Sequence, residues 1–257
     1  MNQWTTLLQK ELLENWRNYK WLWVPVVITI LTIMDPITNY FLPDIIDSVG
    51  NLPEGAVIDL PIPTINEALM MSLEQLGTLG ILIIVLMAMG TIAHERKSGI
   101  TELILTKPVR FSYYVLAKWI SWNLLIWGSL VVAFFINWYY IQLLYGDVSV
   151  SLIVKILFFF GVWLSFVMTV TIFYNTIFTS QGFVAFITLT TIILLHVLAT
   201  VFANRFAWLP SKTTEHIYVM VETNHIPNEL IGSSLMTIGL MIILLIISVI
   251  HLKKQYV

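Results

Sequence analysis

The chain contains no cysteine, and few of its 257 residues are charged. Without cysteine it has no disulfide, no thiolate nucleophile and no thiolate metal ligand. Charged residues make up only 11% of the sequence, against roughly 25% in a soluble globular domain. Hydrophobic residues make up 58%. This composition excludes an ordinary soluble domain and indicates an integral membrane protein.

Sequence motifs for catalysis are also missing. The chain has no G-x-x-x-x-G-K-[ST] loop for nucleotide phosphate, no H-E-x-x-H zinc motif and no G-x-S-x-G nucleophile turn. No apolar segment holds the pair of acids that paired-carboxylate chemistry needs. We therefore expect no catalytic residue, no bound metal and no bound cofactor. If the protein performs work, the energy comes from an ion gradient or from a partner ATPase.

Six apolar segments are each long enough to cross a membrane, which takes about 20 residues. They cover residues 21–42, 76–93, 114–144, 152–178, 183–203 and 235–252. The sequence therefore predicts an all-α polytopic membrane protein with six transmembrane helices. An even number of spans places both termini on one side and segments 43–75 and 204–234 on the other.

Basic residues gather on the side that holds the termini. Ten of the thirteen lie there: Lys10, Arg17, Lys20, Arg96, Lys97, Lys107, Arg110, Lys118, Lys253 and Lys254. The other three are Lys155, Arg205 and Lys212, and segment 43–75 contains no Lys or Arg at all. Because basic loops remain in the cytoplasm, we predict cytoplasmic termini and extracellular segments 43–75 and 204–234.

Residues 1–20 are too polar for the apolar core of a cleavable signal and carry a helical pattern instead. Apolar residues recur at helical spacing opposite polar ones, and Lys10, Glu11, Leu12 and Arg17 belong to this pattern. The pattern predicts an amphipathic helix lying in the headgroup plane. A simple cytosolic extension of the first span is the alternative.

Segment 204–234 is neither plainly polar nor apolar enough to span. Its pattern, with a turn near Asn224 and a restart at Pro227, predicts two short helices that dip partly into the outer leaflet before the last span. The acids and histidines of this segment match no metal-ligand spacing.

Four residues within the spans are weak candidates for a substrate path: Asp35, Asn123, Trp127 and Asn137. An acid within a span suggests function, but a helix end at Pro36 explains Asp35 equally well. Amides in spans often bond across helices instead.

Two further features within the spans favour packing. Gly161, Ser165 and Thr169 recur every four residues and predict a face that a neighbouring helix approaches closely. No acid shares the span of His196, so we interpret this histidine as a packing residue.

Segment 94–113, between the second and third spans, has the character of a docking site. Gly99 permits a sharp helix exit, residues 100–106 can form a short helix, and Pro108 ends it. This short helix would expose apolar Leu103, Ile104 and Leu105. The charged residues Glu95, Arg96, Lys97 and Glu102 lie beside them, so the helix offers apolar anchors ringed by charge, as protein interfaces use. A basic loop held against anionic headgroups is the other interpretation.

The stretch ERKSGITELILTKPVRFSYYVLAK resembles the E-[RK]-x-x-G-T-x-E-x-L-L-x-x-P-[VI]-x-R-x-x-x-x-x-x-K pattern of ABC-2 type transporter permeases, the membrane subunits of bacterial ATP-binding cassette exporters. The matching residues are Glu95, Arg96, Gly99, Glu102, Leu103, Pro108, Val109 and Lys118. The chain departs in two places: Ile100 precedes Thr101, and Arg110 follows Val109 directly. The order of amphipathic helix, six spans and partly re-entrant helices agrees along nearly the whole chain.

The resemblance implies one ABC-2 type transmembrane domain over residues 1–257 and a permease of the bacterial cell membrane. It implies a homodimer, or a heterodimer with a second permease, bound to two copies of a separate ABC ATPase that holds ATP and Mg. No nucleic acid partner is expected. The coupling residues are then Glu95, Arg96, Lys97, Gly99, Thr101, Glu102, Leu103 and Pro108, with the N-terminal helix resting against the same ATPase.

The implied activity is export of an amphipathic or apolar substrate, such as a peptide antibiotic, a toxin or a lipid. We expect charge reversal at Glu95 or Arg96 to abolish coupling without preventing membrane insertion. Two alternatives stay open: a gradient-driven secondary carrier, and a non-transporting receptor or scaffold for a membrane-active peptide.

Overall fold

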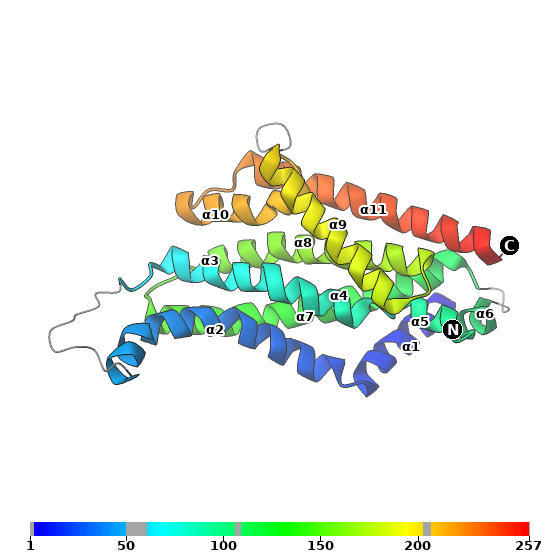
Figure 1. Cartoon of the computed structure of the whole chain (residues 1–257), viewed down its shortest axis with the longest axis horizontal. Coiled ribbons are helices and arrows are strands. Elements are labelled where there is room, and N and C mark those ends of the chain that lie inside the picture. The colour runs from blue at the N-terminus through cyan, green and yellow to red at the C-terminus, as the bar shows by residue number, and fades with distance from the viewer. Residues whose placement is uncertain (1–2, 50–60, 106–108, 203–206, 257) are drawn as a thin grey trace.

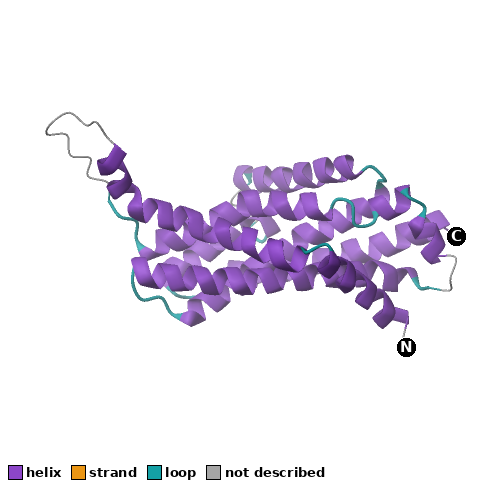
Figure 2. Cartoon of the chain, turned by 90° about the horizontal axis from the view of Figure 1, so that it is seen from below, coloured by secondary structure: helices purple, strands orange, loops and turns teal. Residues whose placement is uncertain are grey.

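The computed structural model describes residues 3–49, 61–105, 109–202 and 207–256. Within these ranges the chain is helical and contains no strand (Figure 2). Six helical segments are long and apolar enough to cross a membrane. They cover Lys20–Ile46, Ile65–Lys97, Phe111–Leu144, Val150–Ile177, Gln181–Val201 and Asn228–Tyr256. The predicted all-α polytopic fold with six spans is therefore confirmed.

The chain contains long helices that form the spans and short helices or helical turns that connect them or form part of a span. Their bounds are α1 (Gln3–Arg17), α2 (Lys20–Val49), α3 (Ile65–Gln75), the π-helical turn η1 (Leu76–Gly80), α4 (Ile81–Ala88), α5 (Ala93–Lys97), α6 (Ile100–Leu105), α7 (Phe111–Leu144), α8 (Val150–Ile177), α9 (Gln181–Val201), the 3-10 turn η2 (Pro210–Lys212), α10 (Thr213–Thr223) and α11 (Asn228–Tyr256).

The spans run along the long axis of the molecule, with α9 inclined across it (Figure 1). Both chain termini lie at one end together with α1, α5 and α6, and we call this the terminal end. The end of α2, the start of α3 and α10 lie toward the opposite, distal end. Helix α8 lies at the centre and packs against α4, α7, α9, α10 and α11.

The predicted small-residue face of α8 packs against α7. A Cβ atom at Gly161 would lie 2.7 Å from the Trp127 ring, so only glycine leaves room there. The Trp127 indole N–H donates to Ser165 Oγ (3.0 Å), and that of Trp119 donates to Thr169 Oγ1 (2.8 Å). Small residues thus admit two large indoles, whose N–H groups find acceptors within the apolar bundle.

Helix α2 does not end at Pro36, one of the two sequence interpretations of Asp35. It continues through Pro36 and Pro43 to Val49. Proline removes one backbone hydrogen bond from a helix interior, at a cost of about 3 kcal/mol. Because α2 packs lengthwise on α7, side-chain burial along this contact outweighs the loss. The Tyr145 hydroxyl also donates to the Pro36 carbonyl (2.6 Å) and ties the two helices together.

Two spans begin earlier in the sequence than their apolar runs. Helix α3 starts at Ile65 with a capping box, in which the Thr64 N–H donates to Glu67 Oε2 (2.7 Å) and the Glu67 N–H donates to Thr64 Oγ1. Helix α11 starts at Asn228, after a left-handed turn at Asn224 (φ 55°). Part of segment 43–75 is therefore helical. Instead of two short helices, the described part of segment 204–234 holds the 3-10 turn η2 and one short helix, α10, followed by the first turns of the last span.

Candidate functional site

A buried network of charges joins three elements at the terminal end. Glu95 on α5 accepts hydrogen bonds at Oε1 from Lys10 on α1 (2.7 Å) and Lys118 on α7 (3.0 Å). Its other oxygen, Oε2, accepts from the Tyr114 hydroxyl on α7 (2.6 Å). Glu11 on α1 completes the network with 2.9 Å to Lys118 and 3.0 Å to Lys10. Glu95 therefore holds α5 to both neighbouring helices.

Because these charged side chains are buried, their contacts strongly constrain how α1, α5 and α7 pack. Lys118 is only 1% exposed, and Glu11 and Glu95 are each 7% exposed. A charge taken out of water costs several kcal/mol unless an opposite charge and hydrogen bonds replace the solvent. Each buried charge here has such partners, so α1, α5 and α7 are tied together as long as all members are present.

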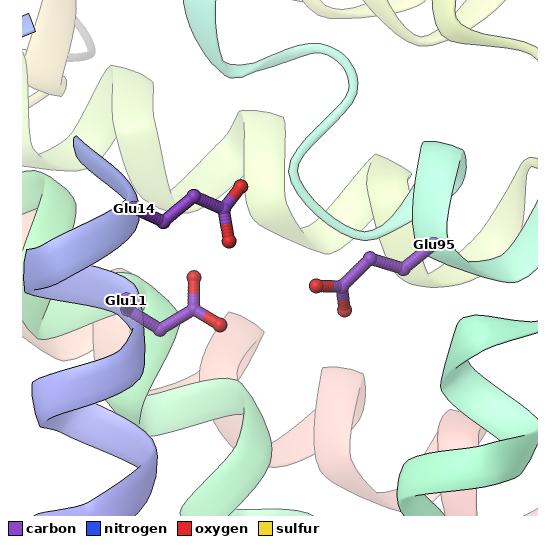
Figure 3. Close-up of side chains that lie close together, drawn as sticks. All are labelled: Glu11, Glu14 and Glu95. Carbon is purple, nitrogen blue, oxygen red and sulfur yellow. The ribbon is translucent and has the colours of Figure 1, made fainter. Parts of the chain in front are cut away.

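Three carboxylates of this network converge. Glu11 and Glu14 reach from α1 and Glu95 from α5, with carboxylate oxygens within 4.8 Å of one another (Figure 3). Lys10 also lies 3.5 Å from Glu14. The ammonium groups of Lys10 and Lys118 balance the two buried carboxylates, Glu11 and Glu95, and Glu14 is exposed to solvent. We therefore interpret the cluster as an ion-pair network.

Lys10 itself lies outside the membrane-spanning segments. Burial and the neighbouring charge of Lys118 lower the pKa of Lys10, but Glu11 and Glu95 outweigh them and bring it above the usual lysine value. Lys10 is therefore charged at neutral pH. A further contact, from the Asn15 amide to Ser121 Oγ (3.0 Å), adds a second tie between α1 and α7.

The second span is interrupted between α4 and α5, and one side chain from α8 closes the gap. Asn175 is fully buried, and its Oδ1 accepts from the backbone N–H groups of Ile92 (3.1 Å) and Ala93 (3.0 Å). Its Nδ2 donates to the carbonyls of Ala88 (3.1 Å) and Thr171 (2.9 Å). Backbone groups inside an apolar bundle must be paired, and Asn175 pairs those that the interruption frees.

Arg96 links α5 to the ends of two other spans. Its guanidinium donates to the carbonyl of Thr176 at the end of α8 (2.6 Å) and to Gln255 Oε1 near the end of α11 (2.8 Å). Cationic groups are favourable at helix C-termini, where carbonyl groups are unpaired. His94 accepts a hydrogen bond at Nδ1 from the Gln181 amide at the start of α9 (2.9 Å). The residues of α5 thus contact the four spans formed by α7, α8, α9 and α11.

Helix α6 presents the accessible part of the predicted docking segment. Gly99 has φ +76°, which favours glycine and separates α6 from α5. Thr101 is buried, with its hydroxyl 3.3 Å from that of Tyr114. Leu103 is 71% exposed, and the charged Lys97 and Glu102 are also exposed. Pro108 lies outside the described residues.

The predicted coupling residues therefore divide into two groups. Glu95, Arg96, Gly99 and Thr101 hold α5 and α6 in place, and Lys97, Glu102 and Leu103 form the exposed surface. Ile104, expected to be exposed beside Leu103, is half-buried and packs against the core.

A polar cavity of about 310 Å³ opens next to the network, between α1, α5, α7 and the start of α9. Glu14, Lys20, Thr91 and His94 are among its lining residues. Lys20 lies 4.4 Å from the ring centre of Trp122, a cation–π contact on the cavity wall. On one side of the network, the cavity lies between α1 and the interrupted part of the second span.

The N-terminal helix carries two of its predicted residues into the protein rather than toward a membrane surface. Lys10 and Glu11 belong to the network described above, while Leu12 is half-buried and Arg17 is exposed. The helical periodicity was predicted, but two polar residues, Glu11 and Asn15, are the ones buried against α7, while Glu14 and Arg17 stay exposed. Buried opposite charges on the two helices make this orientation stable.

The four weak substrate-path candidates lie on two helices, Asp35 on α2 and the other three on α7. Asp35 lies half-exposed on α2, and Asn123 donates to the Trp119 carbonyl of its own helix (2.8 Å). Trp127 fills the face of α8, and Asn137 accepts a hydrogen bond from Ser72 on α3 (3.3 Å). In the described structure each of the last three makes a packing contact within or between helices.

Sequence reasoning missed three members of the site. Tyr114 and Asn175 carry no motif, and Gln255 is an ordinary polar residue near the C-terminus. Lys118 matched the quoted pattern, and its position one helical turn after Tyr114 was the available signal. The partners of Asn175 are backbone atoms, which leave no trace in the spacing of side chains.

The fold and site define a multi-pass α-helical membrane protein with a buried charge network at one end. The chain is 33% identical over 214 residues to the uncharacterized transmembrane protein YxlG of Bacillus subtilis, covering 82% of this chain and 83% of that protein. It belongs to the same family of transmembrane proteins. No protein-family model matches the chain.

Proposed function

We propose that this protein is the membrane subunit of an ATP-driven ABC exporter, moving an amphipathic or apolar substrate with energy from a separate ATPase. The observation that carries the proposal is the connection of exposed α6 to the spans. Leu103 is exposed on α6, and the adjoining α5 is bound through Glu95 to α1 and α7 and through Arg96 to α8 and α11. A force applied at α6 would reach four helices.

Three observations support this assignment. The residues of the α5–α6 segment match the ABC-2 permease pattern, and ten of the thirteen basic residues fall in the parts of the sequence predicted to share a side with the termini, as expected of a cytoplasmic face. The interruption at residues 89–92, closed by Asn175, divides the second span into two rigid pieces. Rigid-body movement of such pieces is an established way to open a path between helices.

The proposed assembly contains two permease chains and two copies of the ATPase, with ATP and Mg bound to the ATPase. Both termini are cytoplasmic in the cell membrane of a bacterium. This chain supplies no catalytic residue to the assembly and holds no cofactor.

Copurification tests the proposal. The chain would be coexpressed with the ATPase encoded beside it, and the ATPase recovered through a tag on this chain would be quantified. We expect one ATPase copy per permease chain. Recovery of the chain alone would contradict the proposal and favour the carrier or receptor alternatives.

The contact surface is tested with exposed residues, because reversing Glu95 or Arg96 would also break the buried ties. We expect Leu103→Ser combined with Lys97→Glu to reduce ATPase recovery to background. Leu143→Ser combined with Lys254→Glu is the matched control: Leu143 is 64% exposed but lies on α7 at the distal end, and Lys254 is exposed on α11. Equal recovery with both variants would rule out α6 as the docking surface.

A further inference from the structure

A large groove opens between the second and fifth spans and α10. Its volume is about 910 Å³, within the roughly 300–1,000 Å³ range of small-molecule sites. The lining comes from α3, η1 and α4 on one side, from α9 on another and from η2 and α10 at the distal end. None of the residues in the charge network lines it, so the groove is separate from the candidate coupling site.

The groove is apolar along most of its length. Six of the aliphatic and aromatic lining residues are Leu73, Ile81, Trp163, Leu189, Ile192 and Val197. Ile192 and Trp163 are largely buried at the base, while Val197 is 49% exposed on the open side of α9. This wall suits an extended hydrocarbon chain, which gains free energy in proportion to the apolar area removed from water.

Ionic side chains gather where η2, α10 and α3 line the groove. Two carboxylates, Glu74 and Glu215, are exposed there, and one ammonium group, Lys212, lies 3.7 Å from Glu215. The lining therefore carries one more carboxylate than it has ammonium groups. The exposed ring of Tyr218 stands on the same α10 face, and aromatic faces attract organic cations.

The second span makes room for the groove at a π-helical turn. η1 carries Gly77, where a Cβ atom would meet nothing within 4 Å. π-helical turns occur frequently at functional sites. A side chain introduced at this lining position would therefore begin in open space beside the groove.

We propose that this groove binds an amphipathic cation, with the hydrocarbon part along α4 and α9 and the positive head against Glu74 and Glu215. The acidic excess disfavours an anionic amphiphile by charge, and the apolar wall disfavours a fully polar ligand. The inference names the substrate class of the proposed exporter and in that sense rests on the proposed function. Binding alone, however, requires no ATPase, so the two can be tested apart.

The test uses the full chain in nanodiscs of zwitterionic lipid, without ATPase. Three photoactivatable dodecyl probes, with trimethylammonium, phosphocholine and sulfate heads, are crosslinked and the labelled peptides are identified by mass spectrometry. We expect labelling of helices 65–88 and 181–201, with a yield about fivefold higher for the trimethylammonium probe than for the sulfate probe, since one exposed ion pair contributes up to about that factor.

Two variants and a control make the test specific. Gly77→Trp should reduce trimethylammonium labelling to background by filling the groove. The double substitution Glu74→Gln and Glu215→Gln should remove the preference among head groups while leaving the apolar labelling. Gly239→Trp is the control, because Gly239 on α11 also meets open space but does not line the groove. A melting midpoint is measured for each variant to verify folding.

Equal labelling by all three probes would overturn the inference and show that the groove binds lipid chains without selecting their head group. A change of oligomeric state in Gly77→Trp without any loss of labelling would overturn it in favour of a subunit contact. Labelling as expected in a chain that recovers no ATPase would support the cationic site while contradicting the exporter. Recovery of the ATPase without selective labelling would support the exporter while contradicting the cationic site.

Discussion

At the scale of single residues, the molecule depends on buried polar groups that satisfy one another. Glu95 accepts hydrogen bonds from two lysines and a tyrosine, and Asn175 uses both ends of its amide on backbone groups. Each of these side chains would be costly in an apolar bundle on its own. Together they favour the observed fit of the helices at the terminal end, because these contacts pair the side chains across α1, α5, α7 and α8.

Lys118→Met should destabilise the protein strongly. The substitution leaves Glu11 and Glu95 buried with only Lys10 to neutralise them, and removing one partner of a buried ion pair costs about 3–5 kcal/mol. For a chain of this size we expect the melting midpoint in detergent to fall by roughly 6 °C or more. Lys254→Met, an exposed lysine on α11, is the control and should not change it. Equal midpoints would mean that the network adds no net stability.

Asn175→Leu should loosen the interruption of the second span. The variant leaves the N–H groups of Ile92 and Ala93 buried without acceptors, at about 1–3 kcal/mol each. We expect faster amide hydrogen exchange at residues 89–97. Asn123→Leu is a matched control, since Asn123 is also buried but hydrogen-bonds only within its own helix. Unchanged exchange in Asn175→Leu would show that water replaces the amide.

At the scale of elements, local chain geometry decides where helices break and how closely they approach. Gly99 separates α5 from α6 through its positive φ, and Gly161 lets Trp127 of α7 reach the backbone of α8. Three prolines do not interrupt α2, because its packing on α7 continues along its length. In α2, packing between spans therefore overrides the low helix propensity of proline. Between α5 and α6, the backbone conformation of Gly99 decides where the helix breaks.

Gly99→Ala should displace α6. A left-handed conformation costs an L-residue with a Cβ roughly 1–2 kcal/mol, and no neighbouring atom lies within 4 Å to add a steric effect. We expect faster hydrogen exchange at residues 100–105 and weaker ATPase recovery. Gly182→Ala, which also meets open space but lacks a positive φ, should change neither. Gly99→Asn should be milder than Gly99→Ala, because asparagine tolerates this conformation better.

At the scale of the whole molecule, the two ends of the bundle differ in kind. The terminal end is rich in basic residues and ion pairs, and the distal end presents the acidic mouth of the groove formed with α10. An even number of spans requires that both termini share one side. If the terminal end is cytoplasmic, the docking surface faces the ATPase and the groove opens toward the outer half of the membrane.

The absence of cysteine makes this orientation directly measurable, since single cysteines can be introduced without removing any. We expect Asn224→Cys to react with a membrane-impermeant maleimide on intact cells. Lys254→Cys and Ser98→Cys should react only after the membrane is permeabilised. The reverse labelling pattern would invert the topology and place α6 outside, where no ATPase can bind it.

Sequence by itself determined the fold class, because six apolar runs long enough to cross a membrane depend only on residue type and order. It also located the α5–α6 segment, since Gly99 and the charges around it form a local pattern. The lengths of the second and last spans were underestimated because their first turns are polar. A capping box stabilises the start of α3, and both α3 and α11 pack against neighbouring helices.

Only the tertiary structure decided which of the predicted residues act together. Lys10, Glu95 and Lys118 are far apart in the chain, and their contact depends on how α1, α5 and α7 pack. The same packing turned Glu95 and Arg96 from surface candidates into internal ties and left Leu103 exposed. The groove likewise depends on the placement of α9 and α10, because a cavity is defined by distances between helices, and residue spacing along the chain does not encode those distances.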